Sequence, residues 1–265
     1  SRWQKVDEVL TNYGFDSLGD FLETVFYVHK GDDDDPRTPK HVAVFTSFLQ
    51  GSSFVKMAHI LQLIYTHPQS RPKIKYPDQV DAAFSSDKPL EEIRFARPCL
   101  NAWAVRTVGN ELYHRIGRLV AKDKNPTSQT HIRATTNGRK EGVRTITWED
   151  TNFTMHGLAD RFREADALIW YITECLCAPR LKGKIVTRAH RPHPAIQVAA
   201  ISSFMISQNS YASGDLALPL SIWHYSCGSH VDVHRVYCRL ASITSLSTAR
   251  KALASMSAAD NNTLQ

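Results

Sequence analysis

The sequence contains no apolar run that approaches the roughly 18 residues needed to span a bilayer. Its first residues, Ser1-Arg2-Trp3-Gln4, lack the apolar core of a secretory signal. Cysteine is sparse, and the count of five is odd, which favours reduced thiols over a disulfide framework. We therefore expect a soluble intracellular chain, nuclear or cytoplasmic, that makes no membrane contact.

The motifs of common active sites are also missing. There is no G-x-S-x-G nucleophile turn and no glycine-rich phosphate loop, since the 12 glycines are spread singly. The adjacent acids Glu149 and Asp150 are better explained by a helix start, where the dipole favours negative charge. The sequence thus predicts no catalytic residues and no cofactor. For this region, the sequence favours a non-enzymatic role over catalysis.

Strand-like alternation is nearly absent, whereas apolar residues recur at helical spacing, as in Val6, Val9, Leu10 and Tyr13. We predict an all-α fold with well over half of the chain helical. A long helix over 91–121, broken near Pro98, and another over about 148–176 are expected.

The predicted helices form two subdomains. A helical subdomain over residues 1–121 and a second one over 148–265 are joined by a basic, flexible loop at 122–147, where polar and basic residues replace large apolar ones.

Charge is distributed unevenly along the chain. Residues 1–35 hold nine acidic and three basic residues, a net charge of −6, so the remainder carries +12. No acidic residue occurs between Glu174 and Asp215, and this stretch contains a basic segment at 178–194. A basic body suits a polyanionic partner, and the alternative is a plain solvated linker. The candidate phosphate-binding residues of this segment are Arg180, Lys182, Lys184 and Arg188.

Residues 229–257 have the pattern of two short helices joined by a polar turn. This shape is typical of a helix-turn-helix, although an ordinary helical pair with a basic face fits the same pattern. The motif requires Leu240, Ile243, Leu246 and Leu253 to pack inward. The residues expected to face DNA are Arg235, Arg239, Ser247, Thr248, Arg250 and Lys251.

Four zinc-competent residues also occur here: Cys227, His230, His234 and Cys238. If 229–240 is helical, they extend over about three turns, roughly 16 Å, which is too far for one tetrahedral ion. Buried cysteines and partly exposed histidines on an amphipathic helix are the favoured explanation. The sequence therefore favours no metal site.

Several motifs together resemble a family of uncharacterised proteins. They lie in order along most of the chain: Phe48-Leu49-Gln50-Gly51, His59-Ile60-Leu61, Ala96-Arg97-Pro98, Ile146-Thr147-Trp148-Glu149-Asp150, the run 203–212, Leu218-Pro219-Leu220, the run 225–230 and the run 239–248. The chain resembles the amino-terminal region of a mobile-element-derived, transposase-like family expanded in mushroom-forming fungi. The resemblance implies a DNA-associated role ahead of a larger part of the same polypeptide, and it supplies no catalytic residues.

The sequence thus favours a DNA-binding or accessory region of a mobile-element-derived fungal protein, with double-stranded DNA and the downstream part of the same polypeptide as partners. Two alternatives stay open. One is a helical protein-interaction scaffold without nucleic-acid contact. The other is a non-catalytic fragment of an enzyme whose active site lies downstream.

Overall fold

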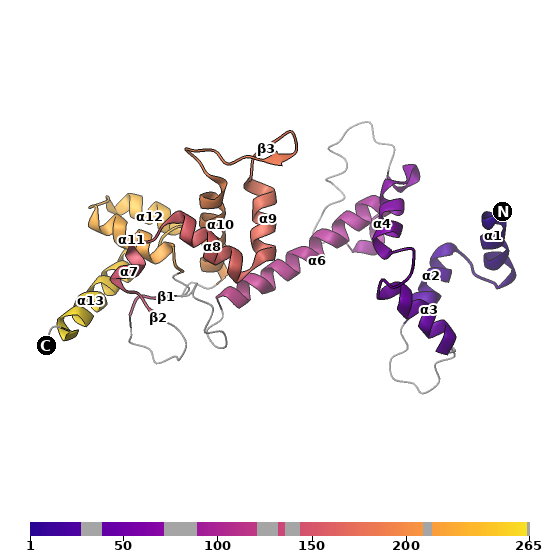
Figure 1. Cartoon of the computed structure of the whole chain (residues 1–265), viewed down its shortest axis with the longest axis horizontal. Helices are drawn as coiled ribbons and strands as arrows, with labels where there is room; N and C mark the ends of the chain where they lie inside the picture. Colours follow the sequence, from indigo (N-terminus) through magenta and orange to yellow (C-terminus); the bar gives the residue numbers. More distant parts are fainter. Residues whose placement is uncertain (28–38, 72–88, 121–131, 136–143, 209–213, 264–265) are drawn as a thin grey trace. The chain divides into compact units, whose positions relative to one another are not determined.

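The computed structural model describes residues 1–27, 39–71, 89–120, 132–135, 144–208 and 214–263 (Figure 1). Most of the predicted basic loop at 122–147 lies outside these residues. The chain divides into two compact units, Ser1–Ala104 and Val105–Gln265.

Helices dominate both units. The first contains α1 (Arg2–Asn12), α2 (Leu18–Phe26), α3 (Pro39–Leu49), α4 (Met57–Thr66), the 3-10 turns Pro68–Ser70 and Leu90–Glu92, and the start of α6 (Ala96–Leu119). The second contains the rest of α6, then α7 (Trp148–Thr151), α8 (Met155–Ala165), α9 (Ala167–Cys177), α10 (His193–Gln208), α11 (Ala217–Ser226), α12 (Val231–Arg239) and α13 (Leu246–Thr263).

Strands are short in the described part of the chain. β1 (Ile132–Arg133) pairs in parallel with β2 (Arg144–Thr145), and β3 (Arg180–Leu181) pairs antiparallel with β4 (Lys184–Ile185). The prediction of a mostly helical chain with little sheet is confirmed. Among the described residues, no helix is both long enough and apolar enough to cross a membrane.

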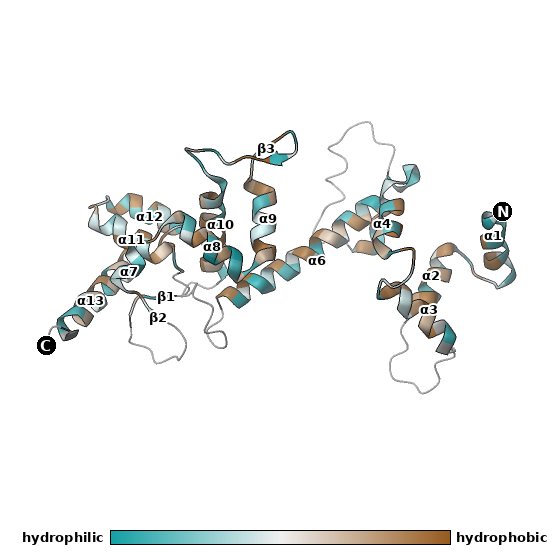
Figure 2. Ribbon diagram, in the orientation of Figure 1, coloured by the Kyte–Doolittle hydropathy of each residue, from teal (hydrophilic) through white to brown (hydrophobic). Residues whose placement is uncertain are grey.

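The first unit buries little of its apolar surface. Helices α1, α2 and α4 contain no buried residue in the described structure, although hydrophobic residues recur along α2 to α4 (Figure 2). Local pairs hold it together: Phe26 packs against Phe45 with ring centroids 5.6 Å apart, and the Arg97 guanidinium lies 4.8 Å from the centroid of the Tyr65 ring. Arg97 also donates to the Tyr65 carbonyl at 2.7 Å.

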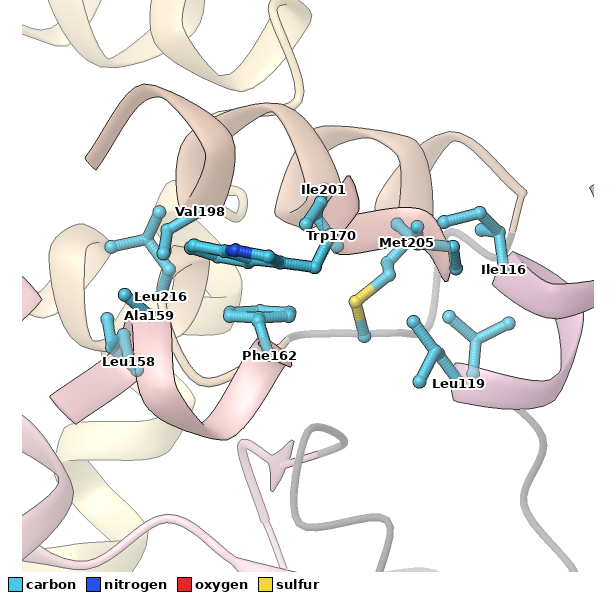
Figure 3. Packing of buried hydrophobic residues seen from close by; sticks show 12 residues of the cluster. Ile116, Leu119, Leu158, Ala159, Phe162, Trp170, Val198, Ile201, Met205 and Leu216 are labelled. Atoms are coloured by element: carbon cyan, nitrogen blue, oxygen red, sulfur yellow. The ribbon is translucent and has the colours of Figure 1, made fainter. Parts of the chain in front are cut away.

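The second unit has a true core. It lies where the end of α6 meets α8, α9 and α10, and Figure 3 shows the ring of Trp170 lying over that of Phe162, with Met205 beside them. Burial of these aromatic rings removes much apolar surface from water, the main favourable contribution to folding. The other members include Ile116, Leu119, Leu158, Ala159, Val198, Ile201 and Leu216.

Two acidic side chains fix the edges of this core. Asp166 caps α9 by accepting from the backbone N–H groups of Leu168 and Ile169, both at 3.0 Å, and also pairs with Arg115 of α6 at 3.1 Å. Asp215, whose side chain is almost fully buried, pairs with Arg161 of α8 at 2.9 Å. A cap and an ion pair on one carboxylate tie the start of α9 to α6.

A smaller core joins α11 and α13. Leu218 and Ile222 of α11 pack with Ala252 and Met256 of α13, and Ile132 and Ile146, which lie within the predicted loop, complete the cluster. The backbone N–H of Ile146 donates to the carbonyl of Arg133 at 2.9 Å. The described residues of the predicted loop, 132–135 and 144–147, are therefore anchored on this core, because each segment carries a buried isoleucine.

Two helix boundaries differ from the sequence-based prediction. Pro98 does not break the long helix: α6 begins at Ala96, so proline occupies its first turn, where a missing N–H costs nothing. The single helix expected over 148–176 is instead α7, α8 and α9. Thr154 accepts from the Gly157 N–H at 3.1 Å and starts α8, and Asp166 starts α9, because these short polar side chains replace intrahelical bonds.

Helices α11 and α12 end with the same motif on different residues. After α11, Gly228 has φ +66°, and the N–H of Ser229 donates to the His224 carbonyl. After α12, Ala241 takes the same position with φ +55°, and the N–H of Ser242 donates to the Tyr237 carbonyl. Both are Schellman caps, which favour glycine because a Cβ is strained at positive φ.

This pair gives a matched test of stability. We expect Ala241→Gly to raise the free energy of unfolding by about 1 kcal/mol, and Gly228→Ala to lower it by about the same amount. A Cβ on Gly228 would meet nothing within 4 Å, so its cost is conformational only. Urea unfolding of the two variants measures both changes, and an Ala241→Gly variant no more stable than the parent would contradict the assignment.

Candidate nucleic-acid interface

The basic segment at 178–194 forms a β-hairpin between α9 and α10. Lys182 and Gly183 have φ values of +50° and +78°, as in the type I′ turn that matches the twist of two paired strands. Arg180 lies opposite Ile185, and Leu181 lies opposite Lys184. At its base the N–H of Val186 donates to the Pro179 carbonyl at 2.9 Å.

Buried polar contacts hold the two helices from which the hairpin projects (Figure 1). Gln197 of α10 is fully buried and donates to the Trp170 carbonyl at 3.0 Å and to the Thr173 hydroxyl at 3.3 Å, both on α9. The His193 ring lies 3.8 Å from the Glu174 carboxylate and 3.5 Å from the Thr187 hydroxyl. The end of the hairpin is thereby connected to both helices.

The surroundings of the Cys177 thiol in this cluster favour its protonated form. Cys177 donates its thiol to the Thr173 carbonyl at 2.9 Å, and burial raises the pKa of the Cys177 thiol. A thiol held protonated is a weak nucleophile. The contacts of the cluster join α9 to α10 at the base of the hairpin.

The four candidate bases of the hairpin region are solvent-exposed. Arg180, Lys182, Lys184 and Arg188 all have exposed side chains, and none is paired with a carboxylate in the part of the chain that the structure describes. Unpaired, closely spaced positive charges attract a polyanion without losing an existing ion pair.

The other candidate residues lie on α12 and α13, and several already have partners. Arg235 pairs with Asp232 at 3.1 Å, whereas Arg239 is exposed. The hydroxyls of Ser247 and Thr248 lie 2.9 and 2.8 Å from the Ser245 hydroxyl, which caps α13 through the Thr248 N–H. Both hydroxyls are therefore engaged in contacts within the first turn of α13.

The two cations of α13 differ. The Arg250 guanidinium lies 5.5 Å from the centroid of the Tyr225 ring on α11, so it stacks while its residue stays exposed. Lys251 is exposed. Arg250 and Lys251 do not belong to the same surface element as the hairpin. Helix α13 packs on α11, whereas the hairpin connects α9 to α10.

One prediction for the α12–α13 pair is wrong. Leu240 is 61% exposed instead of packed inward, because Ala241 reverses the chain directly after it. Ile243 is buried as expected, and Leu246 and Leu253 are half-buried. Ser221 of α11 holds the intervening link by accepting from the Thr244 N–H at 2.6 Å.

Helix α12 exposes its apolar side chains and buries a polar one. Its only buried residue is His234, whereas Val233, Val236 and Tyr237 are exposed. The centroid of the His234 ring lies 6.3 Å from that of His224, and His234 Nε2 is buried without a hydrogen-bond partner in the described structure. An imidazole in these surroundings is favoured in its neutral form.

The four zinc-competent residues are not drawn together. His230 is exposed and caps α12 by accepting from the Asp232 N–H, Cys227 is exposed, Cys238 is half-buried and His234 is buried. Across the described ranges, no three His, Cys, Asp or Glu side chains are grouped so that they could hold a metal ion.

Sequence reasoning missed the apolar residues of the hairpin. Leu181 is 67% exposed and Ile185 is 46% exposed, although both stand among bases. The signal was present in Lys182-Gly183, a turn dipeptide between short alternating flanks, but two-residue strands are too short to show a period.

Comparison with known proteins adds no assignment: no family model, no curated protein and no solved structure matches the chain.

Stability is expected to depend on pH through His234. Burial, and secondly the charge of His224, lower the pKa of His234 from its ordinary value of 6.5. The folded state prefers the neutral ring, whereas the unfolded state takes up a proton as the pH falls below 6.5. The contribution of His234 to the free energy of unfolding is therefore complete above pH 6.5 and is lost below it. The slope from one proton is at most about 1.4 kcal/mol per pH unit.

Unfolding free energies measured between neutral and mildly acidic pH test this. His234→Gln should flatten the dependence, while the exposed His190→Gln serves as the matched control and should leave it unchanged. If the unfolding free energies of the parent and of His234→Gln changed equally with pH, protonation of His234 would not account for the pH dependence.

Proposed function

We propose that the second unit binds double-stranded DNA through its phosphate backbone, with the β3–β4 hairpin as the principal contact. The observation that carries this proposal is the set of four exposed bases, Arg180, Lys182, Lys184 and Arg188, without a carboxylate partner in the described structure. Such contacts release condensed counterions and give salt-dependent, largely sequence-neutral affinity.

A second contact is proposed for the α12–α13 pair, acting as a helix-turn-helix-like element. Lys251 and Arg239 are exposed, and Arg250 can reach solvent from its position over Tyr225. The exposed Leu240 weakens this part of the proposal, because a compact helix-turn-helix would bury it. The α12–α13 pair therefore ranks below the hairpin.

In its wider context, we propose an accessory region of a mobile-element-derived, transposase-like protein, acting with a downstream part of the same polypeptide. The motif resemblance and the basic composition of the second unit support this proposal.

A helical protein-interaction scaffold is the second candidate function. One observation favours it: in the part of the first unit that the structure describes, α1, α2 and α4 bury no residue, and large side chains such as Trp3 and Phe54 are exposed. Exposed apolar faces on amphipathic helices suit a protein partner. On this alternative the second unit would have no DNA affinity.

Fluorescence anisotropy with a labelled duplex at several salt concentrations tests the proposal. We expect measurable binding with a steep salt dependence. The triple variant Lys182→Ala, Lys184→Ala, Arg188→Ala should bind more weakly and lower the salt slope by up to about three units, since each phosphate contact contributes roughly 0.9. Arg250→Ala with Lys251→Ala should lower it by up to about two units.

The matched control removes three exposed bases of the first unit: Arg2→Ala, Lys5→Ala, Lys40→Ala. It makes the same change in net charge and should leave the slope nearly intact. All variants should fold, because exposed charges contribute within roughly 0.5 kcal/mol of stability. Absence of duplex binding by the parent protein would reject the proposal in favour of the scaffold.

A further inference from the structure

The β3–β4 hairpin carries more than charge. Leu181 is 67% exposed, lies directly opposite Lys184 and precedes Lys182 at the turn. Because directly opposed residues of an antiparallel pair share a face, Leu181 and Lys184 lie on one side of the hairpin. Arg180 and Ile185 share the other side by the same rule. One large aliphatic side chain thus shares a face with Lys184 and directly precedes Lys182 of the turn.

Leu181 lies outside the hydrophobic core of the described residues. Leu181 contributes to neither buried cluster, and an exposed two-stranded hairpin gains little stability from an aliphatic side chain in water. Leu176, at the end of α9, is even more exposed at 82%, but it lies outside the paired strands. It therefore provides a comparison of the same residue type.

The hairpin is held firmly at its base. The N–H of Val186 donates to the Pro179 carbonyl, Thr187 meets the His193 ring, and Gln197 ties α10 to α9 behind it. The turn itself has the twist that antiparallel strands favour. An apolar side chain on such a support can be pressed against a partner without first being ordered, which lowers the cost of binding.

We propose that the hairpin is a wedge for distorted duplex DNA, in which Leu181 enters an opened base step while Lys182 and Lys184 hold the flanking phosphates. This inference rests on the proposed DNA-binding function and names the DNA structure that the hairpin selects. Aliphatic side chains beside cations kink duplexes by partial unstacking, which costs a few kcal/mol per step. A step that is already opened avoids that cost and is bound more tightly.

Charge complementarity identifies the occupant. No acidic residue occurs from 175 to 214, so the hairpin and the helix after it present only positive or neutral side chains to a partner. An acidic phospholipid surface shares the negative charge but has no base step to receive Leu181. It is therefore included in the test as the competing outcome.

The test compares three probes: an intact duplex, the same duplex with a single-nucleotide bulge, and vesicles of phosphatidylserine and phosphatidylcholine. We expect the parent protein to bind the bulged duplex about tenfold more tightly than the intact one, a modest share of the unstacking cost. Leu181→Ala should abolish this preference and change intact-duplex affinity by no more than about twofold, because the phosphate contacts remain. Leu176→Ala, the matched control, should retain the preference.

A second readout reports on insertion directly. 2-Aminopurine placed beside the bulge should brighten when the parent protein or Leu176→Ala binds, and should not brighten with Leu181→Ala. The double variant Lys182→Ala, Lys184→Ala should bind both the intact and the bulged duplex more weakly, to a similar extent. Circular dichroism melts confirm folding, which is expected because Leu181 is exposed.

The outcomes separate the two proposals. Equal binding of the bulged and intact duplexes, or equal behaviour of Leu181→Ala and Leu176→Ala, overturns the wedge and leaves the DNA-binding function standing. Failure of the parent protein to bind either duplex overturns the DNA-binding function. Vesicle binding that Leu181→Ala removes, without any preference for the bulge, assigns the hairpin to a lipid surface instead.

Discussion

The packing of α9 against α10 is the contact on which the candidate interface depends. Trp170 of α9 is buried against Phe162, and Gln197 of α10 satisfies the Trp170 carbonyl from within the core. These contacts fix the distance between the end of one helix and the start of the next. A hairpin with two-residue strands is not stable alone, so its shape is imposed by the two helices that it joins. Loss of the core contact would therefore remove the interface as well.

Much of the fold could be predicted from apolar spacing, because each helix of the second unit must bury one face. The positions of the breaks could not. A single threonine at 154 and a single aspartate at 166 divide what the periodicity presents as one helix, since their side chains replace backbone bonds at a helix start. Pro98 misled in the opposite direction: the same residue that interrupts a helix interior is well placed in a first turn. The position of a helix start can depend on a single hydrogen bond, whereas apolar spacing is read over many residues and does not detect it.

The candidate site was predictable only in part. Composition alone indicated that Arg180, Lys182 and Lys184 would be exposed, because unpaired charges stay in water. The environment of α12 could not be read in this way. Leu240 was expected to pack inward, yet Ala241 at positive φ leaves it in solvent, and His234 occupies the buried position of α12 while its valines are exposed. Tertiary packing decided both outcomes, and neither is encoded in local hydrophobicity.

The mixture of charge and apolar surface on the hairpin also has a consequence for solubility. Exposed strand edges with aliphatic side chains tend to pair with other chains, and basic residues on the strands oppose such pairing by mutual repulsion. Lys184 lies directly opposite Leu181, so its positive charge opposes pairing with a second, equally basic hairpin. A polyanion reverses that balance, because it neutralises the lysines and brings its own surface to the leucine. On the proposed function, the lysines that oppose pairing of two hairpins are also the groups that would attract a negatively charged partner to Leu181.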